Sequence, residues 1–168
     1  MGRLARLLKH RWTDRADVDR VLPAEAMARM EARVAASEKR HSGEIRVSVE
    51  PSLPTSYVLK GLAARDRAIM MFGKLRVWDT EHNNGVLVYL MLAEHAIEIV
   101  ADRGLNRHVS REQWQAIVEA MRGAFRDGRF EEGLNAAVDA VDALLAAHFP
   151  LAAGQLNPNE LPDAPWRR

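Results

Sequence analysis

Polar side chains that could bind a cation or move a proton are concentrated in two short segments of the chain. The first segment, 79–84, lies directly before a run of apolar residues, and the second, 102–108, lies directly after an alternating one. Carboxylate and amide oxygens are ligands for Ca²⁺ and Mg²⁺, and histidine can act as an acid or a base near neutral pH. The two segments contain Asp79, Glu81, His82, Asn83, Asn84, Asp102, Arg103, Asn106, Arg107 and His108.

The hydrophobic pattern predicts how these segments are positioned. Residues 86–93 have the length and β-branched content of a buried strand, and Ile97 and Ile99 alternate with Glu98 as in a half-buried one. A turn near residues 94–95 would join the two strands as an antiparallel hairpin. The loops at the open ends of a hairpin lie side by side, so we predict a candidate site at this end of the sheet.

A third strand adds one more carboxylate to this end. Residues 44–50 alternate strictly between polar and apolar side chains, and Pro51 ends the pattern. The helical segment that follows is long enough for a right-handed crossover to a parallel strand, which would place Glu44 beside Gly85. The candidate loop-end site therefore comprises Glu44, Asp79, His82, Asn83, Asn84, Asp102, Arg103, Gly104 and His108.

The opposite end of the sheet is the alternative position for a site. Ligands of parallel sheets bind beyond the carboxyl ends of the strands, and that rule points to Glu50, Glu94 and His95. We prefer the loop end because it gathers more convergent polar groups.

The residue types at the loop end limit its chemistry. Asp79 and Asp102 are weak candidate metal ligands, so we expect no cofactor and at most weak calcium or magnesium binding. A three-histidine zinc site is not expected, because His95 lies at the opposite end of the hairpin from His82 and His108. The chain has no cysteine and no recognised motif for a covalent phosphatase.

A purely structural role is the alternative for the same residues. Asp102 can cap the turn that follows the hairpin, and Gly104 can take a positive φ there. Arg103 can then bridge to Asp79 or Glu44.

Composition narrows the classes of function. The chain has 168 residues, 48% of them hydrophobic, which suits one well-packed domain. A net charge of +1 and an aromatic content of 6% argue against nucleic acid as a partner. No apolar run is long enough to span a bilayer, and the first residues lack a signal-peptide core. We therefore predict a cytoplasmic protein, with a peripheral position at the inner membrane as a further expectation.

The N-terminal segment, 1–22, is basic and amphipathic. Its apolar side chains follow helical spacing, and no acid occurs before Asp14. Such a helix fits a membrane-surface anchor or a docking element, and the alternative is that it folds back onto the domain. The residues predicted to face a membrane are Leu4, Leu7, Leu8 and Trp12, with Arg3, Arg6, Lys9 and Arg11 around them.

The order of predicted elements is helix, strand, helix, strand, strand, helix, helix. Because residues 86–93 need cover on both faces, we predict an α/β fold: a three-layer α/β/α sandwich with one short mixed sheet and a central β-hairpin. The main domain is predicted to span 23–150. The tail, 151–168, is rich in proline and polar residues and is predicted to be disordered.

Several motifs in this order resemble the TPM domain family, over roughly residues 24–149. They are G-E-I-R-V-S-V-E, N-N-G-V-L-V-Y-L, E-I-V-A-D-R-G-L and F-R-D-G-R-F-E-E-G-L. The resemblance implies a three-layer sandwich and a membrane-associated housekeeping role. It also implies weak acid-phosphatase activity or calcium binding, which are reported for some relatives but not for all.

The chain departs from the family pattern where a metal would bind. Asn83, Asn106 and Arg111 stand at positions where many members have acids. Calcium needs several oxygen ligands with enough negative charge, so these replacements weaken such a site.

Three functions remain open from the sequence. We favour a non-catalytic binding or assembly module that is peripheral to the cytoplasmic membrane face, with a protein or an anionic membrane surface as its partner. The alternatives are a weak metal-assisted acid phosphatase and a purely structural domain. The sequence leaves the partner's identity and the oligomeric state open.

Overall fold

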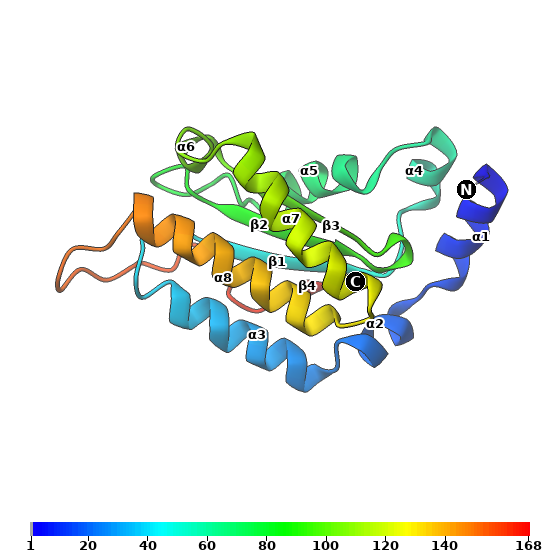
Figure 1. Cartoon of the computed structure of the whole chain (residues 1–168), viewed down its shortest axis with the longest axis horizontal. Coiled ribbons are helices and arrows are strands. Elements are labelled where there is room, and N and C mark those ends of the chain that lie inside the picture. Colours follow the sequence, from blue (N-terminus) through cyan, green and yellow to red (C-terminus); the bar gives the residue numbers. More distant parts are fainter. Residues whose placement is uncertain (1) are drawn as a thin grey trace.

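The computed structural model describes residues 2–168, and all structural statements below refer to these residues. Helices cover both faces of one sheet (Figure 1). The elements are α1 (Arg3–Trp12), α2 (Arg15–Val21), α3 (Ala24–Ser37), β1 (Ile45–Glu50), α4 (Thr55–Lys60), α5 (Ala64–Lys74), β2 (Val86–Met91), η1 (Leu92–Glu94), β3 (Ala96–Ala101), α6 (Arg103–Asn106), α7 (Arg111–Arg126), α8 (Phe130–His148) and β4 (Trp166–Arg167).

The sheet is mixed, with the strand order β3-β2-β1-β4. β1 and β2 are parallel, with Ile45 opposite Val86, and β2 and β3 form an antiparallel hairpin, with Val86 opposite Ala101. The α/β sandwich with a mixed sheet and a hairpin is thus confirmed. Only β2 of the hairpin is internal, because β3 forms an edge of the sheet.

Alternate residues of β2 enter two separate cores, and all six residues of the strand are buried. Val86, Val88 and Leu90 pack on the side covered by α3, α7 and α8. Leu87 and Tyr89 pack on the side covered by α4 and α5. This is the pattern expected of a strand that is covered on both faces.

The crossover between β1 and β2 is helical but contains a break. It consists of two helices, because α4 ends at Lys60 and α5 begins at Ala64. Gly61 has a φ of 71°, a left-handed conformation that glycine adopts without strain and that ends helices.

A buried ion pair joins the crossover to the sheet. The carboxylate of Glu50, at the end of β1, accepts from Arg67 Nε at 2.6 Å and from the Tyr89 hydroxyl at 2.8 Å. Glu50 is completely buried and Arg67 almost so. Burial raises the pKa of the Tyr89 hydroxyl, and the hydrogen bond that Arg67 donates to Glu50 raises the pKa of Arg67, so both keep their protons.

The predicted disorder of the tail, 151–168, is wrong. β4 pairs in parallel with β1, with Ser48 opposite Trp166, and Leu161 is buried. The Arg46 guanidinium donates to the carbonyl oxygens of Pro162 and Ala164. A polar, proline-rich segment has little apolar surface to bury, and here buried charges of β1 bind its backbone instead.

The buried pair leads to a first prediction. Arg67→Ala leaves the Glu50 carboxylate buried without its cation, which should lower the free energy of unfolding by about 3–5 kcal/mol. Arg122→Ala is the matched control, because Arg122 and its partner Glu119 are both exposed, and should cost less than about 1 kcal/mol. Urea denaturation of both variants measures the difference. Equal losses of unfolding free energy would show that the pair of Glu50 and Arg67 does not stabilise the fold.

Candidate functional site

The backbone brings the predicted loop end together. Val86 N donates to Glu44 O at 2.8 Å, Asp102 N donates to Gly85 O at 2.9 Å, and the amide of Gly104 donates to Asn83 O at 2.8 Å. The starts of β1 and β2 and the end of β3 are therefore adjacent, as the hairpin and the parallel crossover predict.

Two members of the predicted site have backbone roles. A Cβ atom at Gly104 would lie 2.6 Å from the carbonyl oxygen of His82 and would also collide with that of Asn83. Only glycine therefore allows α6 to approach the loop before β2 so closely. Asn83 has a φ of 51°, a left-handed conformation that asparagine tolerates better than most residues.

The side chain of Glu44 binds the C-terminal tail. Its carboxylate accepts from Asn157 Nδ2 and from Leu161 N, each at 3.1 Å, and the residue is fully buried. Burial raises its pKa, although the bonds from the tail oppose this rise. The side chain fastens the tail rather than facing a ligand.

The remaining charged and histidine side chains do not converge. Asp79 is exposed and pairs with Arg76 at 2.7 Å. The bridge predicted from Arg103 to Asp79 or Glu44 is not among the ion pairs of the described residues. His82 is exposed, and the ring of His108 stacks on His148 with centroids 4.8 Å apart. Asp79 and His108 thus have neighbouring partners that the sequence does not show.

Asn84 and Asp102 retain binding capacity. Asp102 Oδ1 accepts from Arg103 N at 2.6 Å and caps α6, as predicted, but its Oδ2 atom is buried without a partner among the described residues. Asn84 Nδ2 donates to Ser42 Oγ at 3.3 Å, and its Oδ1 atom is likewise buried and unpartnered. These two oxygens can accept hydrogen bonds from water or contact a hard cation.

Acidic and histidine side chains are too dispersed for a strong metal centre in the part of the chain that is described. No group of three or more His, Asp or Glu side chains is placed to hold an ion there. Asp102 supplies one negative charge at the loop end, while Asp79 already has a cationic partner. A hard cation would meet one carboxylate and one amide, a set that suits only weak binding.

The opposite end of the sheet is also occupied by internal contacts. Glu50 is held by Arg67 and Tyr89, and the ring of His95 packs edge-on against Phe130 at 5.3 Å between centroids. Glu94 is bound by the N-terminal helix.

One face of α1 is fixed to the domain. Arg6 Nε and His10 Nε2 both contact Glu94 Oε1, at 2.6 and 2.8 Å. Leu53 N donates to His10 Nδ1 at 3.0 Å, so that nitrogen is unprotonated and Nε2 carries the hydrogen. Burial acts to raise the pKa of Glu94, but the hydrogen bonds from Arg6 and His10 prevail and lower it.

The opposite face of α1 is exposed and apolar. Leu4, Leu8 and Trp12 follow i, i+4 spacing and are 71%, 40% and 75% exposed. Arg6 was predicted to surround this face, but it binds the domain instead, and Leu7 packs partly against the core under α5. The helix therefore folds back onto the domain and still presents an apolar stripe, and membrane binding stays a prediction.

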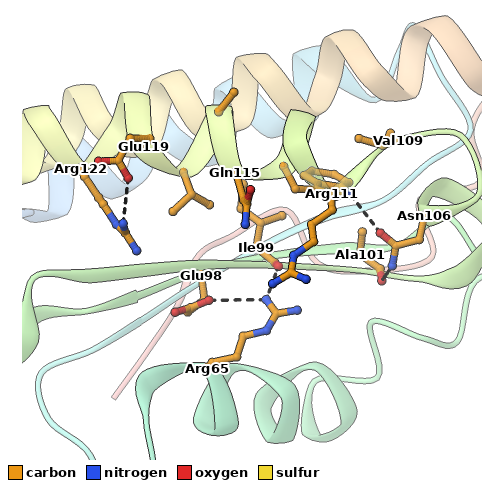
Figure 2. Close-up of a pocket in the computed structure, with 13 residues that line it drawn as sticks. Arg65, Glu98, Ile99, Ala101, Asn106, Val109, Arg111, Gln115, Glu119 and Arg122 are labelled. Carbon is orange, nitrogen blue, oxygen red and sulfur yellow. Dashed lines mark hydrogen bonds and ion pairs between the residues drawn. The ribbon is translucent and has the colours of Figure 1, made fainter.

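A groove that the sequence did not predict lies along the free edge of β3. It has a volume of about 900 Å³ and runs between β3 and α7, with Arg65 of α5 at its margin (Figure 2). Arg111 and Gln115 project from α7 along it. The only sign of this groove in the sequence is a row of polar residues at helical spacing on α7. Such a row also fits an ordinary solvent-exposed helix face, so it does not predict a groove.

Comparison with known proteins agrees with this architecture. The family model TPM_phosphatase, described as the TPM domain, matches residues 16–144. The chain belongs to the TPM domain family. The match begins after α1, so the apolar stripe lies outside the part that this TPM domain shares with its family.

Solved structures support the same fold. The NMR structure of BA42 from the psychrophilic bacterium Bizionia argentinensis has a TM-score of 0.75 at 29% identity, covering 88% of this chain and 95% of that one. An N-terminal domain from P. gingivalis, also solved by NMR, has a TM-score of 0.63 at 23% identity, covering 77% and 79%. The search of curated proteins found no match.

We expect a buried acid, Glu38, to make the stability of the fold depend on pH. Glu38 accepts from Ile45 N at 3.0 Å, and burial raises its pKa to about 9. The nearby carboxylates of Glu44 and Asp163 act in the same direction. A raised pKa means that the folded TPM domain binds this proton more tightly than the unfolded chain. The resulting stability is present in full below about pH 4.5 and is lost as the pH rises to about 9.

Glu38→Gln tests this assignment, because the amide can still accept from Ile45 N and carries no charge. We expect the variant to melt at least about 4 °C higher than the wild type near pH 9 and to lose that advantage near pH 4.5. Glu31→Gln, on the exposed face of the same helix, should leave the melting profile unchanged. Parallel profiles for wild type and Glu38→Gln would contradict the raised pKa.

The loop end gives a third prediction. Calorimetric titration of the TPM domain with calcium should show a Kd no tighter than about 1 mM, because one free carboxylate supplies too little charge. Asp102→Asn should remove any such binding, and Asp79→Asn should not. Micromolar calcium affinity would mean that side chains beyond Asp102 and Asn84 converge on the ion.

Proposed function

We propose that this TPM domain protein is a non-catalytic docking module that binds the anionic, cytoplasmic face of a membrane through α1. The observation that carries the proposal is the stripe of Leu4, Leu8 and Trp12, which is exposed while the other face of the same helix is fastened to Glu94. A helix held in this way presents its apolar side chains in a set orientation, so little ordering is needed on docking.

The charges beside the stripe favour a lipid surface. Arg3, Lys9 and Arg11 are exposed on α1 and take part in no ion pair among the described residues. Each cation near an anionic leaflet adds about 1 kcal/mol of attraction, and insertion of the apolar side chains adds to this. Three cations and a narrow stripe suit reversible, salt-sensitive binding. None of the described helices is long and apolar enough to cross a bilayer.

The fourth prediction tests this function directly. The full-length protein should co-sediment with vesicles containing phosphatidylserine, bind pure phosphatidylcholine much less, and dissociate as salt rises. Leu4→Ser, Leu8→Ser and Trp12→Ser together should reduce binding at least about tenfold, because the apolar contribution is lost. Their exposure means that the fold should be unchanged, which the amide NMR spectrum checks.

The control for this experiment is a second triple variant. Ile69→Ser, Trp78→Ser and Leu156→Ser also remove three exposed apolar side chains, but these lie outside α1, and binding should stay within about twofold of the wild type. Serine variants are preferable to deletion of α1, because deletion would leave Glu94 without Arg6 and His10. Equal binding by the two triple variants, or no binding of the wild type to anionic vesicles, would retire the proposal.

A weak metal-assisted acid phosphatase is the second candidate. It is suggested by the name of the family model and by the buried, unpartnered Oδ2 atom of Asp102, which could hold a cation that polarises a phosphoryl oxygen. The contacts of Asp79 and Glu44 leave it without a second carboxylate. Hydrolysis of p-nitrophenyl phosphate that requires magnesium or calcium and is abolished by Asp102→Asn, but not by Asp79→Asn, would support it over docking alone.

A further inference from the structure

One edge of the sheet is closed by the chain itself, and the other is open. The tail adds β4 alongside β1, so the β1 edge already has a neighbour. β3 forms the opposite edge and has no second strand beside it. An uncovered strand edge is a template for pairing with another chain, and proteins usually block it or use it.

The outward backbone groups of β3 lie in the groove beside α7. Asp102 N bonds to Gly85 O across the hairpin, and the alternation of an antiparallel ladder then directs the groups of Ile97, Ile99 and Ala101 away from β2. No acceptor among the described residues binds the amides of these three residues. They are free to donate to a segment in the groove.

Side chains occupy the outward carbonyl groups in place of a strand. The Arg65 guanidinium donates to Ile99 O, and Asn106 Nδ2 donates to Ala101 O at 2.7 Å. Both donors are exposed side chains that can release these carbonyls at small cost. The outward carbonyls are therefore capped by side chains that an incoming strand can displace.

The groove presents guanidinium groups on both sides of the β3 edge. Arg65 enters from α5 and Arg111 from α7, and both point over Ile99 (Figure 2). Arg65 has a loose ion pair with Glu98 at 3.6 Å, while Arg111 has no hydrogen-bond or ion-pair partner among the described residues. Farther along α7, Arg122 pairs with Glu119 at 2.8 Å. At the Ile99 end, Arg111 thus has no carboxylate partner among the described residues and Arg65 has only a loose one.

We propose that this groove binds an extended, acidic segment of another protein as a strand added to β3, with a carboxylate of that segment between Arg65 and Arg111. β3 has six residues, a length of roughly 20 Å, and accommodates about six residues of an extended peptide. The added strand takes the amides of Ile97, Ile99 and Ala101, and Gln115 of α7 is placed to meet its side chains. This site is separate from α1 and does not depend on membrane docking.

A second copy of this chain is a poorer occupant of the same edge. Pairing of β3 with β3 would bring Arg65 and Arg111 of one copy against the same residues of the other. Like charges opposed across a strand pair are destabilising. An acidic segment supplies the opposite sign.

The test uses an acetylated hexapeptide of sequence V-E-V-D-V-E with the full-length, ¹⁵N-labelled protein. The amide signals of Ile97, Ile99 and Ala101 should shift on titration, and their hydrogen exchange should slow. Arg111→Glu should weaken binding at least about tenfold, because it replaces the unpaired cation by an anion. An acid in the first turn of α7 suits the helix dipole, so this variant should remain folded.

Three controls separate strand addition from simple charge attraction. Lys60→Glu makes the same charge change on an exposed residue of α4 outside the groove, and should alter the affinity less than about twofold. A peptide with lysine in place of the acids should not bind. A peptide with the same charge and two central prolines lacks the two central main-chain donors and should bind at least about tenfold more weakly.

Several results would overturn the proposal. They are the absence of β3 shifts at about 1 mM acidic peptide, equal binding by wild type and Arg111→Glu, and equal binding by the proline peptide. Protection of β3 that grows with protein concentration in the absence of peptide would assign the edge to a second copy instead. Retention of vesicle binding by Arg111→Glu would show that the two surfaces act separately.

Discussion

The polar face of β1 is the constraint on which the rest of this structure depends. Ile45, Val47 and Val49 enter the core under α3 and α8, but the side chains between them are buried as well. A buried charge is costly unless it is paired, so each charged group on this face must recruit a partner from another segment. Glu50 accepts from Arg67 of the crossover. Arg46 donates to carbonyl groups of the tail, and Glu44 accepts from amides of the same tail.

These pairings explain why Glu44 and Glu50 of this TPM domain do not converge with its other acids on one site. Alternation of charged and apolar residues in a strand normally indicates one face in water, and acids at strand ends normally indicate a site. In this chain the carboxylate of Glu44 binds the tail at one end of β1, and that of Glu50 binds the crossover at the other. The acids with the most suggestive positions are therefore the ones whose bonds the fold requires. What remains at the loop end is the unpaired Oδ2 atom of Asp102 and the amide oxygen of Asn84.

The sequence predicts β1, β2 and β3, their directions and the loop end well, because these follow from local periodicity and short connections. The hairpin after Val86 and the meeting of Glu44, Gly85 and Asp102 needed no long-range information beyond the handedness of a crossover. The prediction that the tail is disordered was wrong, because the tail is ordered by residues more than 100 positions away in the sequence. One example is the hydrogen bond from Arg46 to the carbonyl oxygen of Ala164. The same holds for the partners of single side chains. A carboxylate such as Asp79 has the same sequence signature whether it faces a ligand or a neighbouring arginine.

The surfaces left without internal partners are more informative about function than the charges that have them. The buried charges of β1 have partners within the fold. The apolar stripe at Leu8 and the outward amides along Ile99 have none among the described residues. The stripe lies outside the matched family region, whereas the β3 edge lies inside it. The membrane contact proposed for α1 thus uses residues before the matched region, while the open strand edge is built from elements of the domain itself. The two proposed surfaces, α1 and β3, lie on different elements, so if both proposals hold, one molecule could bind a membrane and an acidic partner at the same time.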